Sequence, residues 1–348
     1  TVFPNAAVTL NVVAEGTGPL SYQWYQDGRP IDGATASTLP FASVTFSHQG
    51  TYKVVVTSPA GSASSDETLL RVVTPPPPPA RLVNLSVRAQ AGTGENALTL
   101  GFVTQGTTHK ELLIRGAGPS LVEFGIQDAL GDPQLTLFAE HGQLSAHNND
   151  WESSPGIAAT FARLGAFAFP AGSKDAAISA SLSPGAYSAQ LTSADGGSGV
   201  ALVELYDANS EDQNSRLINL SVRNFVGAGE RSMLVGIVIQ GSLPKTLLIR
   251  GVGPTLRDFG LNDVLADPHL ALLSGSIVME QNDNWGGTES LRERFAAVGA
   301  FALPDTSLDS ALLVTLMPGT YTVQLSGVNA TTGIALLEIY AVPEKSEE

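Results

Sequence analysis

The chain of 348 residues is acidic and contains no cysteine. Its 18 Lys and Arg residues stand against 33 Asp and Glu residues, which gives a formal net charge of −15 at pH 7. Such a charge repels phosphate backbones and anionic membrane surfaces, so we expect no nucleic-acid partner. The absence of cysteine excludes disulfides, thiolate metal sites and thiol catalysis. No apolar run reaches the roughly 18 residues of a membrane helix, and we expect no membrane insertion.

The first 73 residues alternate apolar and polar positions between turn signals, a pattern typical of half-buried strands. Trp24 lies in one such strand, and Tyr52 precedes Val54 by two residues in another. Over residues 1–73 this pattern resembles a bacterial immunoglobulin-like domain. The resemblance implies that Trp24 is the core tryptophan and Tyr52 the tyrosine corner. It also implies that Val12 and Val54 pack where that fold usually has its two cysteines.

The chain begins at Thr1 without a charged-then-apolar leader, and we interpret it as a mature or trimmed product. Five consecutive prolines lie in residues 74–80. They favour polyproline II, at about 3.1 Å per residue, and predict a semi-rigid spacer. The alternative, a ligand for a proline-reading domain, is the less common use of such tracts.

The rest of the chain is a duplication. Residues 81–88 return as 216–223, and residues 112–119 return as 247–254, each 135 positions later. The match continues almost to residue 343. The predicted divisions are an immunoglobulin-like domain (1–73), a polyproline linker (74–80), repeat 1 (81–208), a linker (209–215), repeat 2 (216–343) and an acidic tail (344–348).

Each repeat shows many short alternating stretches separated by Gly and Pro, which predicts a β-sandwich or jelly roll. A Gly-x-Gly-Pro turn leads into a short helical stretch at 120–124, and two further helical stretches are expected at 157–164 and 289–298. The predicted fold class is therefore all-β: an immunoglobulin-like sandwich plus two tandem β-sandwich or jelly-roll repeats with short helical segments.

Three motifs recur in the second half of each repeat: Asp-Pro-x-Leu, an Asn/Asp cluster before tryptophan, and Pro-Gly-x-Tyr. With these motifs the repeats resemble the bacterial pre-peptidase C-terminal domain family. The whole unit also resembles modules found beside immunoglobulin-like domains in large secreted proteins of environmental bacteria. These resemblances imply a secreted or cell-surface bacterial protein, and they imply no particular activity.

The sequence offers no catalytic constellation, and we expect no enzyme and no cofactor apart from the possibility of calcium. Oxygen-rich Asn/Asp loops can bind calcium, which takes six to eight oxygen ligands. The candidate ligands are Asp132, Asp150, Asp267 and Asp283. The more common role of such loops is a turn held by hydrogen bonds from side chain to backbone, and the sequence favours that reading.

Trp151 and Trp285 follow the Asn/Asp clusters and could form a platform on which sugars stack. Packing at the edge of a sandwich is the more common role of such residues. Arg115 and Arg250 end matching strands, and we expect them to form surface ion pairs with Glu204 and Glu338 respectively. Neither feature demands catalysis.

Two functions are consistent with these features. The first is a non-catalytic extracellular structural or adhesive protein of the bacterial surface or matrix, which could be the subunit of a self-assembling filament. The alternative is a carbohydrate-binding or adhesion module released from a larger secreted enzyme. The expected partners are other copies of the chain, other surface proteins or glycans.

Overall fold

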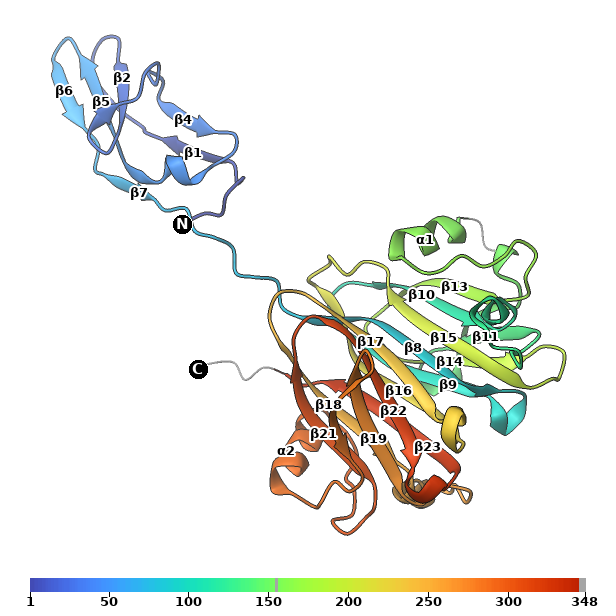
Figure 1. Cartoon of the computed structure of the whole chain (residues 1–348). Coiled ribbons are helices and arrows are strands. Elements are labelled where there is room, and N and C mark those ends of the chain that lie inside the picture. The colour runs from blue at the N-terminus through green and yellow to red at the C-terminus, as the bar shows by residue number, and fades with distance from the viewer. Residues whose placement is uncertain (154–155, 344–348) are drawn as a thin grey trace. The chain divides into compact units, whose positions relative to one another are not determined.

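The computed structural model of the protein describes residues 1–153 and 156–343 (Figure 1). The chain forms two compact units, Thr1–Pro77 and Pro78–Glu348, so the division lies inside the proline-rich segment. The tail at 344–348, expected from the sequence as a separate acidic segment, lies outside the described residues.

The first unit is a small β-sandwich. One sheet pairs β1 with β4, and the other has the order β3-β2-β5-β6 with β7 also on β5. Its elements are β1 (Val8–Asn11), β2 (Ser21–Gln26), β3 (Arg29–Pro30), β4 (Thr38–Phe41), the 3-10 helix η1 (Phe46–His48), β5 (Gly50–Ser58), β6 (Gly61–Ser64) and β7 (Thr68–Leu70).

The core of this unit is of the immunoglobulin-like type. Trp24 is buried, and its indole nitrogen donates a hydrogen bond of 2.9 Å to the Ala36 carbonyl. Tyr52 is buried, and its hydroxyl donates to the His48 carbonyl, four residues earlier, at 2.7 Å. This backward bond is the tyrosine corner of immunoglobulin-like sandwiches.

The two valines at the positions of the usual cysteines are not equally buried. Val54 is completely buried, opposite Trp24 in the pairing of β5 with β2. Val12 is only half-buried. The centre of the sandwich is therefore filled more by the side chains of β2 and β5 than by a symmetrical valine pair.

Tyr52→Phe should lower the free energy of unfolding of the first unit by about 1–2 kcal/mol, because the partly buried His48 carbonyl loses its donor. Urea unfolding followed by tryptophan fluorescence would measure this loss. Tyr25→Phe makes the same chemical change on β2 and is the control. Equal effects of the two substitutions would show that the hydrogen bond from Tyr52 to His48 contributes no extra stability.

The second unit contains sixteen strands among the residues described here. The first repeat supplies β8 (Arg81–Ala91), β9 (Leu98–Gly106), β10 (Lys110–Ala117), β11 (Pro133–Phe138), β12 (Leu144–Asn148), β13 (Ala176–Leu182), β14 (Gly185–Ser193) and β15 (Gly199–Asp207). The second repeat supplies β16 (Ser215–Val226), β17 (Met233–Gln240), β18 (Lys245–Val252), β19 (Pro268–Ser274), β20 (Ile277–Asn282), β21 (Ser310–Leu316), β22 (Gly319–Gly327) and β23 (Gly333–Ala341).

Short helices connect these strands, as the sequence predicts. The α-helices are α1 (Ile157–Leu164) and α2 (Glu289–Ala297). The 3-10 helices are η2 (Gly94–Asn96), η3 (Pro119–Phe124), η4 (Glu140–Gly142), η5 (Trp151–Ser153), η6 (Gly229–Arg231), η7 (Pro254–Phe259) and η8 (Val328–Ala330). The predicted all-β class with short helical segments is confirmed. Over the described parts of the chain, no helix has the length and apolar character needed to cross a membrane.

Each repeat contributes two four-stranded sheets. In the first repeat the strand orders are β13-β10-β15-β8 and β9-β14-β11-β12. In the second they are β21-β18-β23-β16 and β17-β22-β19-β20. The first two strands of each repeat, which follow one another in the chain, therefore form the edges of different sheets.

The two repeats join edge to edge, which the sequence did not indicate. β8 pairs antiparallel with β17, and β16 pairs antiparallel with β9 (Figure 1). Both sheets thus continue from one repeat into the other. In addition, Leu82 of β8 pairs with Leu217 of β16, which connects the first strands of the two repeats. A single hydrophobic core contains buried residues of both repeats. The repeats are units of sequence that share their sheets and their core.

The helices cover the outer faces of β10 and β18 and create a second, smaller core in each repeat. On β10, Leu112 faces the shared core, whereas Leu113 packs with Ile157 and Phe161 of α1. Leu248 of β18 packs in the same way in the second repeat. Because these strands are buried on both faces, side chains that alternation places outward are also shielded from water.

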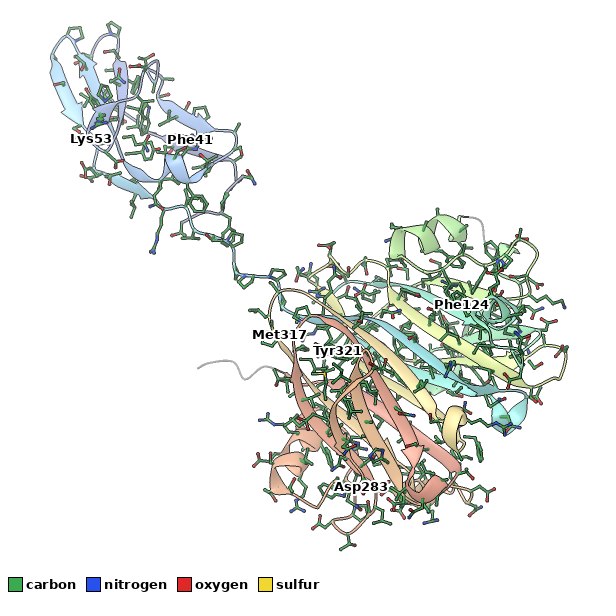
Figure 2. The ribbon with its side chains drawn as sticks, viewed as in Figure 1. Phe41, Lys53, Phe124, Asp283, Met317 and Tyr321 are labelled. Atoms are coloured by element: carbon green, nitrogen blue, oxygen red, sulfur yellow. The ribbon has the colours of Figure 1, made fainter. Side chains whose placement is uncertain are left out.

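A tyrosine corner recurs in both repeats. The Tyr187 hydroxyl donates to the Ser183 carbonyl at 2.9 Å. The Tyr321 hydroxyl donates to the Met317 carbonyl at 2.9 Å, and Figure 2 labels these two residues. Both tyrosines belong to the repeated Pro-Gly-x-Tyr motif. The motif therefore has a clear structural role at the turn into β14 and β22.

Candidate functional site

The Gly-x-Gly-Pro turn of the first repeat is held by a buried aspartate. The Asp175 carboxylate accepts hydrogen bonds from the Gly118 amide at 2.7 Å and from the Ser120 amide at 3.3 Å. The hydroxyls of Ser120 and Ser173 also donate to it, the latter at 2.6 Å. A side chain at Gly118 would lie 2.2 Å from the Leu130 carbonyl oxygen, so the turn requires glycine there.

The second repeat has the same arrangement. Asp309 is fully buried and accepts hydrogen bonds from the Gly253 amide at 2.7 Å and from the hydroxyls of Thr255 and Ser307. Neither aspartate was among the site residues predicted from the sequence. A signal for them existed, because Ser-x-Asp recurs at 173–175 and 307–309. Their bonds are used inside the fold and leave the carboxylates closed to solvent.

The two tryptophans lie beneath the helices. Trp151 is 9% exposed and Trp285 is 2% exposed. The indole nitrogen of Trp151 donates to the Ser173 hydroxyl at 3.2 Å, and that of Trp285 donates to the Pro304 carbonyl at 3.0 Å. This burial leaves neither ring with an exposed face on which a sugar could stack.

The calcium candidates of the first repeat lie near a lysine. Asp132 is buried and forms an ion pair with Lys174, with 2.5 Å between carboxylate oxygen and ammonium nitrogen. Asp150 is exposed and is close enough to Lys174 to raise the pKa of that lysine, although less than Asp132 does. The ammonium group thus occupies the position that a cation would need to approach Asp132.

In the second repeat the position of that lysine is taken by Leu308. Asp267 is half-buried there, and burial, followed by the charge of Asp283, raises the pKa of its carboxyl above the ordinary value. Figure 2 shows Asp283 at the outer end of the repeat. Within 1–153 and 156–343, no group of three or more His, Asp or Glu side chains is arranged to hold a metal ion.

Arg115 forms the predicted pair with Glu204, but inside the protein. The two residues are directly opposite in the pairing of β10 with β15, and Nε lies 3.5 Å from the carboxylate. The Arg115 guanidinium carbon lies 4.0–4.4 Å from the ring centres of Phe161, Phe167 and Phe169. Such stacking stabilises a cation in a dry environment.

Burial dominates the electrostatics of this site. It lowers the pKa of Arg115 and raises the pKa of Glu204, while each opposes the shift of the other through its charge. The Tyr206 hydroxyl donates to the second carboxylate oxygen at 2.7 Å. Phenylalanine rings thus surround the guanidinium of Arg115, and a tyrosine hydroxyl binds the carboxylate of Glu204.

The second repeat contains the closer version of this pair. Arg250 is fully buried, and two of its nitrogens lie 2.8 and 2.9 Å from the Glu338 carboxylate. A third nitrogen donates to the Phe301 carbonyl at 2.6 Å, and the Tyr340 hydroxyl donates to Glu338 at 2.7 Å. The predicted pairing is confirmed in both repeats. The predicted surface position is wrong, because the helical segments cover these outward faces.

The linker between the repeats is fixed by an aspartate. The Asp212 carboxylate accepts hydrogen bonds from the Thr108 hydroxyl at 2.5 Å, the Asn214 amide at 2.9 Å and the Ser215 hydroxyl at 2.8 Å. These bonds lower the pKa of Asp212 to about 2, from an ordinary value of 3.8. The linker therefore has a defined conformation against the end of β10.

Asp212→Asn should remove a pH-dependent part of the stability. Because the folded pKa is depressed, the ionised carboxylate stabilises the fold above pH 3.8, and this stabilisation is lost as the pH falls toward about 2. The wild-type advantage over the variant in urea midpoint should shrink across this window. Asp258→Asn, an exposed change on η7, is the control. A constant difference from pH 7 to pH 2 would contradict the assignment.

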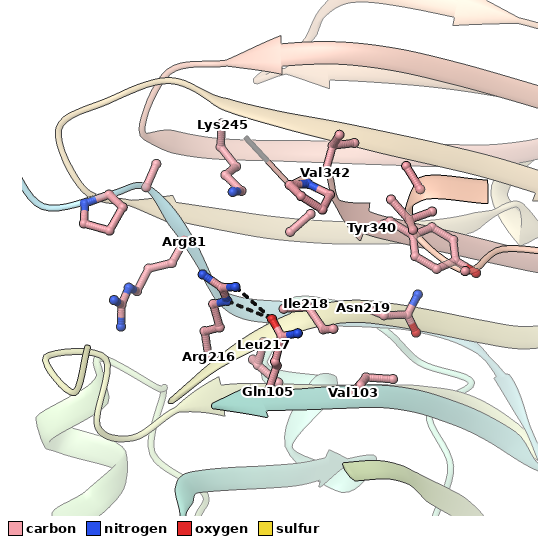
Figure 3. Close-up of a pocket in the computed structure, with 17 residues that line it drawn as sticks. Arg81, Val103, Gln105, Arg216, Leu217, Ile218, Asn219, Lys245, Tyr340 and Val342 are labelled. Carbon is pink, nitrogen blue, oxygen red and sulfur yellow. Dashed lines mark hydrogen bonds between the residues drawn. The ribbon is translucent and has the colours of Figure 1, made fainter. Parts of the chain in front are cut away.

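A pocket of about 680 Å³ opens where the two repeats meet (Figure 3). Three basic residues, Arg81, Arg216 and Lys245, lie among the residues that line it. Among the described residues that line it none is acidic, although the whole chain has a charge of −15. In Figure 3 the Arg216 guanidinium reaches the Gln105 amide oxygen, which it meets at 2.8 Å.

Comparison with known proteins gives limited relationships. No family model matches the chain, and the resemblance of the repeats to the pre-peptidase C-terminal family stays a prediction. Over 53 residues, 15% of the chain, it is 45% identical to the Decoration protein of Escherichia phage T5. The matched region is 32% of that protein, so the chain spans about a third of this curated relative.

Solved structures of immunoglobulin domain tandems are also similar. Sidekick-1 immunoglobulin domains 1–5 match 96% of the chain and 95% of their own length, at 9% identity and a TM-score of 0.20. The three N-terminal domains of the Highly Immunogenic Outer Capsid protein of bacteriophage RB49 match 98% of the chain and 88% of their own length, at 12% identity and a TM-score of 0.20. At these scores the likeness carries no argument, and the fold rests on the strand pairing described above.

Proposed function

We propose that the protein is a non-catalytic structural or adhesive component of an extracellular surface, and that it associates with other proteins through open sheet edges. The buried charged groups of each repeat support this proposal, because they bond to one another and to the turns. The partners would be further copies of the chain or other surface proteins, in a bacterial surface or matrix. The short match to a phage protein named a decoration protein accords with a surface role.

One observation carries the proposal. Strand β20 lies at the end of its sheet, and three consecutive apolar residues on it are exposed: Ile277 at 70%, Val278 at 51% and Met279 at 45%. Among the described residues, β20 pairs with β19 and with no other strand. Natural proteins usually protect such an edge with charge, proline or a covering segment, because its unpaired backbone groups can pair with another chain.

The repeats themselves show how such an edge can be used. They join through two antiparallel strand pairs, and each pairing continues a sheet from one repeat to the next. Addition of a strand to β20 would extend the same sheet by the same backbone chemistry. Apolar side chains on β20 would then be covered, which adds about 25 cal/mol for each Å² of apolar surface buried.

Val278→Lys tests this function. A charge in the middle of β20 should abolish concentration-dependent assembly seen by light scattering and electron microscopy, with the fold unchanged by circular dichroism. Val13→Lys is the matched control, since Val13 is also an exposed valine. Strictly monomeric wild-type particles at high concentration, with no binding to surface extracts, would count against the proposal. So would assembly that is equal in the two variants.

A further inference from the structure

A lysine and an aspartate of the first repeat form an ion pair that is closed to solvent. Lys110 is the first residue of β10, and Asp207 is the last residue of β15. The Lys110 Nζ atom lies 2.7 Å from the Asp207 Oδ1 atom, and both side chains are 0% exposed. Burial of two charges is costly, and their attraction offsets this cost only when the remaining polar atoms are also bonded.

One oxygen of the Asp207 carboxylate does not meet this condition. Oδ1 lies against Lys110 and accepts a hydrogen bond from the Asn209 amide at 3.1 Å. Oδ2 is buried and has no hydrogen-bond partner among the residues that the structure describes. Burial raises the pKa of Asp207 above its ordinary value, although the hydrogen bond and the charge of Lys110 oppose this shift. The site therefore holds a carboxylate poorly and would accommodate a neutral group better.

The amino group of Lys110 is held by three oxygens. Besides the Asp207 carboxylate, it contacts the Asn209 carbonyl at 3.3 Å and the Ser215 carbonyl at 3.4 Å, and it donates to both. The pairing of β10 with β15 fixes the backbones from which the two side chains extend. The nitrogen of the lysine and the carboxyl group of the aspartate are thus kept together with little freedom to separate.

We propose that Lys110 and Asp207 condense into an intramolecular isopeptide bond and release one water molecule. A proton first passes from the ammonium to the carboxylate, which leaves a neutral amine and a carboxylic acid. The lone pair of Nζ then forms a bond to Cγ, and the bond from Cγ to Oδ2 breaks with its electron pair. Oδ2 leaves as water, with the transferred proton and a second proton from Nζ. The step needs no oxidant, reductant or cofactor, because the charges of the pair cancel.

The surroundings of the pair supply what this step requires. Well-oriented groups within one molecule react as if each were present at about 10⁵–10⁸ M. The Asn209 amide donates to Oδ1 and stabilises the negative charge that develops there when Nζ attacks. Oδ1 becomes the carbonyl oxygen of the product, and the new N–H group donates to the Ser215 carbonyl. The oxygen that leaves is the one that has no partner in the ion pair.

Two other places in the chain lack this combination. The Lys174 Nζ atom lies 2.5 Å from the Asp132 carboxylate, but the Lys174 side chain is 59% exposed. Water solvates that ammonium and keeps it charged, so we expect no bond there. In the second repeat Ala341 stands where the first repeat has Asp207, because the two residues occupy the same register opposite β18 and β10.

Mass spectrometry of the full chain, folded and then denatured for the measurement, tests the proposal. The wild-type protein should be lighter than its sequence by the mass of one water molecule. Lys110→Arg is the control and should have its full mass, because an arginine keeps the positive charge but its guanidinium stays protonated and does not attack. A wild-type protein of full mass after prolonged incubation in the folded state would overturn the proposal. The wild-type measurement decides the matter even if the buried variant is unstable.

A tryptic peptide map locates the lost water. Trypsin should fail to cleave after Lys110, and a branched peptide should join this lysine to the peptide that contains Asp207. Cleavage after Lys174 should be normal, which makes the exposed pair a control within the same molecule. Loss of water at any other residue, or in Lys110→Arg as well, would contradict the assignment. So would its occurrence in a chain kept unfolded in urea since synthesis, because the reaction depends on the folded strands.

Discussion

Asp175→Ala lowers the free energy of unfolding of the second unit by about 3–5 kcal/mol, one of the two largest effects that we expect. The substitution removes a buried acceptor that the Gly118 and Ser120 amides share with two hydroxyls. Hydrogen bonds to a charged group contribute roughly 1.5–3 kcal/mol each, and the abandoned donors lose their hydration as well. The turn that positions η3 against β10 would then lose its anchor.

Urea unfolding followed by circular dichroism would measure this effect. Glu123→Ala is the control, because it removes an exposed carboxylate from the same 3-10 helix. Asp309→Ala should behave like Asp175→Ala, since the Gly253 amide and the hydroxyls of Thr255 and Ser307 donate to Asp309 as their counterparts do to Asp175. A loss below about 1 kcal/mol in both repeats would mean that the aspartates are not the anchors of these turns.

The second large effect is expected for Arg250→Met, again about 3–5 kcal/mol. The substitution leaves the Glu338 carboxylate buried without its cation, and an uncompensated buried charge is strongly destabilising. The double variant Arg250→Met/Glu338→Gln should recover much of the loss, because the neutral amide still accepts a hydrogen bond from Tyr340. Unfolding free energies of the four proteins form a double-mutant cycle.

The sign of the coupling decides the interpretation. If the double variant is as unstable as the sum of the two single variants, the ion pair contributes nothing of its own. Arg292→Met is a useful control, because its ion pairs with Glu289 and Asp305 are exposed. Exposed pairs of this kind typically contribute about 0–1 kcal/mol.

The faces of the strands, the short helices and some of the ion pairs could be predicted from the sequence. Alternation placed Arg115 outward on one strand and Glu204 outward on another, and the two are indeed neighbours. Burial of that pair could not be predicted, because it depends on where the Phe161 helix docks. The alternation of apolar residues along a strand or helix shows which face is buried, but it does not show where a helix packs on a sheet.

The pairing of the two repeats could not be predicted from the sequence. Residues such as Val87 and Val235 show that each strand has an apolar face, but backbone hydrogen bonds decide which strands are neighbours. The anchoring role of Asp175 was missed for a related reason. Two of its four partners are backbone amides, which have no signature among the amino acids.

The edge-to-edge joint also has a consequence for biosynthesis. When a ribosome has made only the first repeat, β8 and β9 would already be folded while their future neighbours, β17 and β16, are still absent. The backbone N–H and C=O groups along the free edges of β8 and β9 would then be unpaired and open to other chains. A nascent chain of this kind gains from rapid elongation, because prompt synthesis of residues 209–240, which contain β16 and β17, keeps other chains from pairing with β8 and β9.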